Sequence, residues 1–199
     1  MAKILNISRH RMGTDGKGIT TLVGFYGCPL RCKYCLNPHC FAPDTRVEEL
    51  TAEELYQRLK CDDLYFVATG GGVAFGGGEP LLNIDFLEDF KKIVENRWQL
   101  TAETCLSVEE ENVRRSIKVF HEFIVDIKDT APDIYLAYTG KSNVLPLKNL
   151  STLAEKCPEK VIIRLPLIPD YNTPDHVKRS EEYLRSMGFT RFDKFKYRT

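Results

Sequence analysis

The chain has 199 residues, a length that suits one domain with a substantial core and leaves little room for a second. Lysine plus arginine and aspartate plus glutamate both number 28, so net charge gives no reason to expect a nucleic acid or an anionic membrane as partner. The sequence has neither the ~18 consecutive apolar residues of a membrane span nor the apolar core of a signal peptide in residues 1–10. We therefore expect one cytoplasmic, monomeric domain over 1–199.

Strand and helix patterns alternate along most of the chain. A capping box at Thr51 and Glu54 marks the start of the first helix. About six such βα units predict an α/β fold, a partial (βα)6 TIM-like barrel with parallel strands and outer helices, whose active centre lies at the C-terminal ends of the strands. The expected strands are 19–26, 73–75, 100–106, 123–128, 161–167 and 192–197, and the expected helices are 51–60, 83–98, 108–119, 146–156 and 174–187, with a further helical pattern at 132–138.

A short loop after the first of these strands gathers Cys28, Cys32 and Cys35 in a C-x3-C-x2-C pattern. Soft thiolates select zinc, copper(I) or iron–sulfur centres. A structural zinc site takes four protein ligands, which His39 or Cys40 could complete here, whereas a 4Fe–4S cluster can be held by three cysteines with one iron left open. The seven cysteines are an odd number, so a disulfide framework is not expected, and the roles of Cys40, Cys61, Cys105 and Cys157 stay open.

A second motif, Gly76-Gly77-Gly78-Glu79-Pro80, follows the expected strand at 73–75. Glycines there let the backbone approach a ligand closely, although a glycine run alone is also typical of a hinge. On the expected strand 123–128, Asp126 and Lys128 share one face and point to the same end of the sheet. Charged groups that face a barrel mouth need a partner, and an ion pair between Asp126 and Arg164 is the structural alternative to a binding role.

The two motifs together resemble those of radical S-adenosylmethionine (SAM) enzymes, including the aromatic residue, Tyr34, before the third cysteine. Nearly the whole chain resembles the glycyl radical enzyme activating enzymes, the pyruvate formate-lyase activase family. The segments that carry this narrower resemblance are Asp15-Gly-Lys-Gly-Ile19, Glu103-Thr-Cys105, Asp126-Ile-Lys128 and Arg164.

The resemblance implies a cofactor site and a reaction. Cys28, Cys32 and Cys35 would bind a 4Fe–4S cluster; Tyr34, Gly76, Gly77, Gly78 and Glu79 would bind SAM; Glu103 and Asp126 would hold a monovalent cation beside the SAM carboxylate; and Lys128 and Arg164 would contact SAM or substrate. Reduced flavodoxin or ferredoxin would supply an electron, and SAM would be cleaved to methionine and a 5′-deoxyadenosyl radical. That radical would abstract a glycine hydrogen from a partner glycyl radical enzyme.

Four departures from the activase pattern leave the substrate open. Leu36 stands where a histidine is common, Leu106 replaces the glycine after Glu-Thr-Cys, and Lys196 and Arg198 replace proline and histidine of the C-terminal motif. A cysteine-rich insert is also missing between Cys40 and Cys61, so one cluster is expected. The alternatives are a radical SAM enzyme acting on a small molecule such as a deazapurine, a class III ribonucleotide reductase activase, and a non-enzymatic zinc-binding or electron-transfer module.

The expected barrel has too few strands to close. The sequence stops at Thr199, directly after the sixth expected strand, and six strands do not complete the ring of an eight-stranded barrel. We therefore expect a lateral gap through which a macromolecular substrate can reach the cofactors.

Overall fold

A computed structural model describes residues 1–197 and is built on one eight-stranded sheet with the order β3-β1-β2-β4-β5-β6-β7-β8. Six neighbouring strands, from β2 to β8, are parallel, and β1 pairs antiparallel with both β2 and β3. The strands are β1 Ala2–Met12, β2 Ile19–Phe25, β3 Glu48–Leu50, β4 Gly72–Gly77, β5 Gln99–Thr104, β6 Glu122–Asp126, β7 Val161–Leu167 and β8 Arg191–Lys196.

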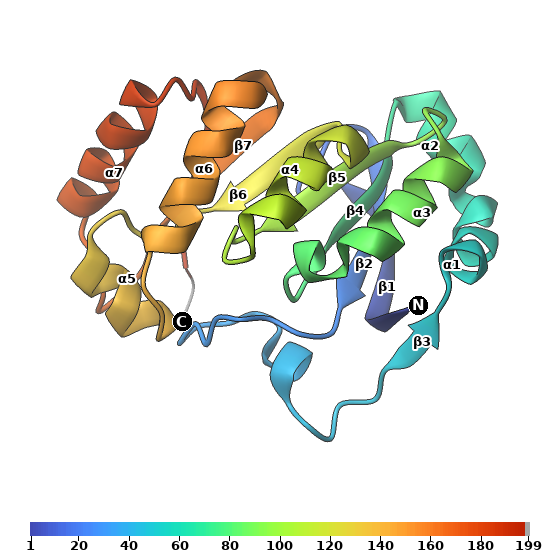
Figure 1. Cartoon of the computed structure of the whole chain (residues 1–199), viewed down its shortest axis with the longest axis horizontal. Coiled ribbons are helices and arrows are strands. Elements are labelled where there is room, and N and C mark those ends of the chain that lie inside the picture. Colours follow the sequence, from blue (N-terminus) through green and yellow to red (C-terminus); the bar gives the residue numbers. More distant parts are fainter. Residues whose placement is uncertain (198–199) are drawn as a thin grey trace.

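The helices cover the outer face of this sheet, whereas α5 lies at one end, beside the segment that follows β2 (Figure 1). None of the helices in residues 1–197 is both long and apolar enough to cross a membrane. The α-helices are α1 Ala52–Leu59, α2 Asp63–Thr69, α3 Ile84–Val94, α4 Glu110–Val119, α5 Pro132–Thr139, α6 Val144–Lys156 and α7 Pro174–Ser186, and the 3-10 helices are η1 Pro38–Phe41, η2 Lys60–Asp62, η3 Pro80–Asn83 and η4 Pro158–Lys160.

The six parallel strands and the outer helices confirm the partial (βα)6 barrel, and the Thr51–Glu54 capping box is present. Apart from the four 3-10 helices, three elements were not predicted: β1, β3 and α2. Two boundaries are also corrected. Helix α3 ends at Val94, well before Trp98, because Glu95 adopts a positive φ of 50° that no helix continues. Strand β6 ends at Asp126, so Lys128 lies in the loop that follows it.

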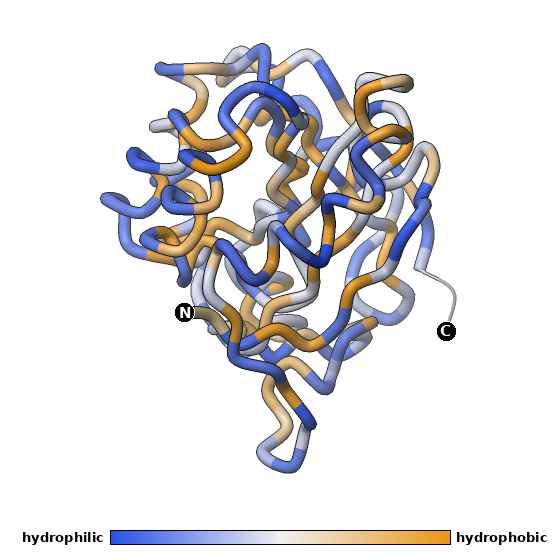
Figure 2. Tube along the Cα trace, turned by 90° about the vertical axis from the view of Figure 1, so that its right-hand side faces the viewer, coloured by the Kyte–Doolittle hydropathy of each residue, from blue (hydrophilic) through white to orange (hydrophobic). Residues whose placement is uncertain are grey.

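The core lies between the sheet and the helices. Aromatic rings fill its centre, where Phe75 on β4 contacts Phe25 on β2 and Phe90 on α3, with ring centroids 5.8 and 5.4 Å apart. Along the helices, hydrophilic and hydrophobic residues follow one another at short intervals (Figure 2), as expected for helices with one buried face. This packing fixes the strands firmly enough that the loops at their C-terminal ends can form a site.

The turn after β5 shows how one departure from the activase pattern is accommodated. Leu106, which stands where the family has glycine, adopts a φ of 55° in the left-handed region. That conformation costs a residue with a side chain roughly 1–2 kcal/mol. The Leu106 side chain is fully buried, and the side-chain amide of Asn149 on α6 donates hydrogen bonds to the carbonyls of Leu106 and Val108 at 2.9 and 2.7 Å. Burial and hydrogen bonding therefore offset the backbone strain.

A glycine variant is usually less stable than an alanine variant at a buried position. At Leu106 we expect the opposite order, because the backbone there is left-handed. We expect Leu106→Ala to lose about 2–5 kcal/mol of unfolding free energy, and Leu106→Gly to lose less, because glycine relieves the strain. Leu100 on β5 is equally buried and has a negative φ, so there the glycine variant should be the less stable one. Urea denaturation of the four variants measures this order, and a glycine variant less stable than alanine at both positions would contradict the interpretation.

Candidate active site

The C-terminal ends of the parallel strands surround a cavity of about 160 Å³. Three kinds of group line it: the thiols of the cysteine loop, the backbone of the glycine run and a set of charged side chains. Its lining includes Cys28, Cys32, Cys35, Gly77, Gly78, Glu79, Glu103, Asp126, Lys128 and Arg164. The structure therefore brings ten of the twelve predicted site residues to one place, and leaves Tyr34 and Gly76 out of the lining.

The cysteine loop is held at its start and in its middle by backbone hydrogen bonds. At its start, the carbonyl of Gly27 accepts from the amide of Glu79 at 2.8 Å. Further along, the amides of Arg31 and Lys33 donate to the carbonyls of Thr139 and Tyr138 at 2.9 and 3.1 Å, at the C-terminal end of α5. Because Cys32 lies between these two amides, the last turn of α5 determines where its thiol stands.

The donor set fits a cluster held by three cysteines. Cys28, Cys32 and Cys35 line the cavity, whereas Cys40 is buried in η1 and His39 and Cys40 are both absent from the described lining. In residues 1–197, no three side chains of the His, Cys, Asp or Glu type converge closely enough to hold a single metal ion. A 4Fe–4S cube makes no such demand, because each thiolate binds a different iron atom.

The first and second cysteines differ in electrostatic surroundings. A hydrogen bond with the Cys105 thiol lowers the pKa of Cys28, and burial raises the pKa of Cys32 to about 11. Cys105 was not assigned a role from the sequence. Its thiol donates to Glu79 Oε2 at 3.0 Å, which places this proton on the buried carboxylate.

The glycine run allows β4 to lie directly against the base of the cysteine loop. A Cβ atom at Gly78 would lie 2.2 Å from the carbonyl oxygen of Gly27, and Gly77 has a left-handed φ of 81°. Gly76 faces Glu103 instead, whose Oε2 would lie 3.0 Å from an added Cβ. The run is thus required by close packing, and it exposes the backbone of Gly77 and Gly78 to the cavity.

The Glu79 carboxylate is buried and already accepts four hydrogen bonds. One oxygen accepts from Leu81 N at 3.1 Å and Thr104 Oγ1 at 2.7 Å, and the other from the amide and thiol of Cys105 at 2.8 and 3.0 Å. Burial raises its pKa despite these donors. Glu79 therefore connects the ends of β4 and β5, and its contact with SAM stays a prediction.

Three ion pairs occur in place of the alternative pairing of Asp126 with Arg164. The two residues are cross-strand neighbours, but Asp126 pairs with Lys128 at 3.4 Å, and Arg164 pairs with Glu103 at 3.3 Å and with Asp193 at 3.1 Å. The reason is that Lys128 lies beyond the strand end and folds back over the cavity, where its ammonium also contacts Tyr197 Oη at 3.3 Å. Burial alone would lower the pKa of Lys128, but Asp126 and Tyr197 raise it well above its usual value, so it stays charged.

Tyr34, which the resemblance implies as a SAM-binding residue, is not among the residues that line the cavity. Its hydroxyl donates to Asp170 Oδ2 at 3.0 Å, and its ring packs edge-on against Tyr138 and Tyr171. Sequence reasoning in turn gave no role to Tyr197, which lines the cavity, because its motif matched the activase pattern only loosely. Arg198, which belongs to the same motif, lies outside the described residues.

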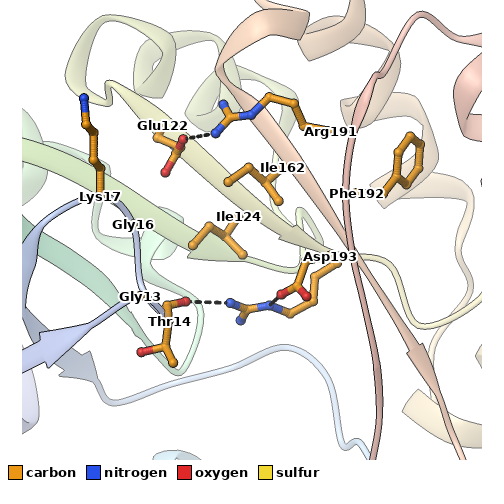
Figure 3. Close-up of a pocket in the computed structure, with 11 residues that line it drawn as sticks. Gly13, Thr14, Gly16, Lys17, Glu122, Ile124, Ile162, Arg191, Phe192 and Asp193 are labelled. Atoms are coloured by element: carbon orange, nitrogen blue, oxygen red, sulfur yellow. Dashed lines mark hydrogen bonds and ion pairs between the residues drawn. The ribbon is translucent and has the colours of Figure 1, made fainter.

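A second, larger cavity of about 530 Å³ adjoins the first on the inner face of the sheet. The turn between β1 and β2 forms one wall, and β6, β7 and β8 form the other (Figure 3). Arg164 lines both cavities, and its guanidinium donates to the carbonyl of Thr14 at 3.0 Å. The sheet itself does not close, because β3 and β8 are its two edges. Glu122, Ile162 and Arg191 lie at or near the starts of β6, β7 and β8, so this cavity extends toward the N-terminal ends of the strands, and the lateral gap stays a prediction.

Comparison with protein families identifies the chain. The family model described as Radical SAM superfamily matches residues 22–184, so the chain belongs to the radical SAM superfamily. Members of this superfamily use a 4Fe–4S cluster and SAM, in agreement with the three cysteines that line the cavity. The assignment favours the cluster over the zinc alternative.

Curated relatives carry the names of activating enzymes. The chain is 41% identical over 127 residues to the pyruvate formate-lyase-activating enzyme of Clostridium pasteurianum, covering 64% of this chain and 53% of the relative. It is 30% identical over 185 residues to the enzyme of the same name from Listeria monocytogenes, covering 88% and 74%. The chain thus spans about half the length of the first relative and about three quarters of the second.

A solved structure confirms the fold. SuiB of Streptococcus suis superposes with a TM-score of 0.67 over 87% of this chain and 38% of its own, at 15% sequence identity. At that identity the likeness concerns the arrangement of strands and helices alone.

The buried carboxylate of Glu103 should make stability depend on pH. Burial raises its pKa to about 7 although Arg164 acts in the opposite direction, so the folded chain keeps a proton that the unfolded chain loses near its ordinary value of 4.5. The contribution of Glu103 to the unfolding free energy is fully present below pH 4.5 and is lost as the pH rises toward 7. Between pH 5 and 8 we expect the unfolding free energy of the native chain to fall relative to that of Glu103→Gln by on the order of 2 kcal/mol.

Glu110→Gln is the matched control for this measurement. Lys148 and Arg114 lower the pKa of the partly buried Glu110 carboxylate, so the native chain should gain stability relative to Glu110→Gln as pH rises through the acid range. Urea denaturation at several pH values tests both, and a constant difference between the native chain and Glu103→Gln would contradict the assignment.

Proposed function

We propose that the chain activates a glycyl radical enzyme by cleaving SAM and abstracting a hydrogen atom from a glycine of that partner. The observation that carries the proposal is the cavity at the C-terminal ends of the strands, which the three cysteines line, in a sheet whose edge strands β3 and β8 do not pair with each other. The names of the curated relatives support the same activity. A small-molecule substrate would require loops of the chain itself to seal the larger cavity against water.

Cys28, Cys32 and Cys35 would hold the cluster, and its chemistry is to supply the electron that breaks the sulfonium C–S bond of SAM. The protein's own side chains would bind and orient SAM. Asp126 Oδ1 is buried, has no hydrogen-bond partner in residues 1–197, and lines the cavity, so it is an acceptor for an ammonium group such as that of SAM. The permanently charged Lys128 offers the complementary partner for a carboxylate.

The finer predictions about cations and partners belong to this proposal. Glu103 and Asp126 line one cavity, as a monovalent-cation site requires, although each is paired with a cationic side chain here. Flavodoxin or ferredoxin is the proposed electron donor, and the exposed Arg31 and Lys33 on either side of Cys32 support an acidic carrier. The exposed Leu36 at the cavity supports contact with a protein substrate.

Cluster binding and SAM cleavage test the first part of the proposal. Anaerobically reconstituted protein should bind about one 4Fe–4S cluster and release 5′-deoxyadenosine slowly with dithionite and SAM. Cys32→Ala should lose both properties, because only two ligands remain. Cys40→Ala and Cys157→Ala, which remove buried thiols outside the lining, should keep them. Stoichiometric zinc without iron, or cluster loss on changing Cys40 alone, would contradict the assignment.

The larger cavity provides the test of the substrate class. Ile162→Trp places an indole in this cavity without touching the cysteine-lined one, so we expect it to reduce glycyl radical formation on a partner glycyl radical enzyme at least tenfold. The glycyl radical is measured by its doublet electron paramagnetic resonance signal. Release of 5′-deoxyadenosine without partner should be unchanged. Leu64→Trp, on the exposed surface of α2, is the control and should affect neither.

A further inference from the structure

A set of buried polar side chains holds the loop that carries Lys128. Strand β6 ends at Asp126, and beyond it the ladder to β7 continues only through the amide of Ile127, which donates to the carbonyl of Arg164 at 3.1 Å. Lysine has a long side chain with many rotamers, so a fixed ammonium requires a fixed backbone. Lys128 is nevertheless only 7% exposed, with its ammonium 3.4 Å from the Asp126 carboxylate. Contacts beyond the strand must supply this order.

Asp129, the next residue, is a buried carboxylate held by neutral donors. It is 2% exposed. Its oxygens accept hydrogen bonds from the amide of Ala131 at 2.9 Å, the hydroxyl of Ser180 on α7 at 3.4 Å and the side-chain amide of Asn172 at 3.1 Å. Burying a carboxylate is costly unless its oxygens are hydrogen-bonded, so these donors stabilise one conformation of the loop. The carboxylate thereby ties the residue after Lys128 to α7 and to the loop that precedes it.

Asn172 reaches both Asp129 and Lys128. It lies in the short loop between β7 and α7 and is 8% exposed. Besides the bond to Asp129, its Nδ2 atom donates to the carbonyl of Pro166 at 3.1 Å and, at a longer distance of 3.5 Å, to the carbonyl of Lys128. Its Oδ1 atom accepts from the amide of Ile168 at 2.6 Å. One side chain therefore joins the end of β7 to the loop after β6.

The loop between β7 and α7 also contacts the cysteine loop. The hydroxyl of Tyr34 in the cysteine loop donates to the carboxylate of Asp170, two residues before Asn172. The loop thus touches the cysteine loop and the Lys128 loop, and it fixes one relative to the other. Asn172 and Asp129 themselves are absent from the described lining of the cavity, whereas Lys128 belongs to it. Their effect on a bound ligand therefore passes through Lys128.

We propose that Asn172, together with Asp129, is a positioning residue that holds the Lys128 ammonium where the carboxylate of SAM binds. This inference rests on the proposed function, in which Lys128 is the partner of that carboxylate. A charge-assisted hydrogen bond depends on distance and angle, so a backbone shift at Lys128 weakens the bond without removing either charged group. Asn172 would thus determine how strongly the chain distinguishes SAM from a ligand that lacks the carboxylate.

Asn172→Ala removes the donors to Asp129 and Lys128 and leaves every residue of the cavity lining in place. We expect it to weaken SAM binding about tenfold, and to leave unchanged the binding of S-adenosyl-3-methylthiopropylamine, which is SAM without its carboxylate. Equilibrium dialysis against anaerobically reconstituted protein, with no reductant present, measures both dissociation constants without turnover. Asn149→Ala is the matched control, because it also removes a buried asparagine that donates to two carbonyls, and it should keep the native ratio of the two constants.

A double-mutant cycle identifies the route of the effect. In the Lys128→Met background, Asn172→Ala should no longer change the SAM dissociation constant, because the ammonium that Asn172 positions is gone. Asp129→Asn keeps the shape of the side chain and replaces one acceptor oxygen by a donor, so it disturbs the same contacts. It should weaken SAM binding with the same selectivity, and it provides the test if Asn172→Ala does not fold.

Three results would overturn the inference and leave the proposed function intact. The first is an equal loss of affinity for both ligands in Asn172→Ala, and the second is an undiminished effect of Asn172→Ala in the Lys128→Met background, since either would indicate a general structural role. The third is unchanged SAM binding in folded Asn172→Ala while Lys128→Met loses affinity. Unchanged SAM binding in Lys128→Met would instead refute the proposed contact between Lys128 and the SAM carboxylate.

Discussion

The buried carboxylate of Glu79 is the interaction on which the rest of the site depends. It fastens the end of β4 to the end of β5 through Thr104 and Cys105, and the amide of the same residue holds Gly27 at the start of the cysteine loop. Removing a hydrogen-bonded charge from such a position leaves several donors unpaired, which is more costly than the loss of any single bond. One residue thus joins two strands and the loop that carries the thiols.

Charge is arranged around this anchor so that each buried ion has a partner. Glu103 with Arg164, and Asp126 with Lys128, place two carboxylates and two cations at one cavity without a large net charge. Such a site can exchange its internal partners for the ammonium and carboxylate of an amino-acid group without burying an uncompensated charge. The mutual pairing of these residues in the structure therefore agrees with the proposed binding of SAM.

Local patterns predicted much of this arrangement. The cysteine spacing, the glycine run and the alternation of β-branched strands with capped helices indicated the parallel sheet and ten residues of the cavity lining. What they could not predict were contacts between segments distant in sequence. Arg164 pairs with Asp193, its neighbour on β8, and not with Asp126, its neighbour on β6, and it also reaches Thr14, a contact that depends on how the sheet curls. Strand β1 was missed although the turn at Asp15-Gly16 before a clear strand is typical of a hairpin.

The contact between Arg164 and the first turn bears on the mechanics of the barrel. In a complete barrel, backbone ladders run around the whole circumference, so the ring cannot widen without breaking many hydrogen bonds. Here the last stretch of the circumference, between the β1–β2 turn and β8, is bridged by the side chain of Arg164 through Thr14 and Asp193. The ring can therefore widen and narrow at the cost of a few side-chain contacts, while every strand pairing is kept.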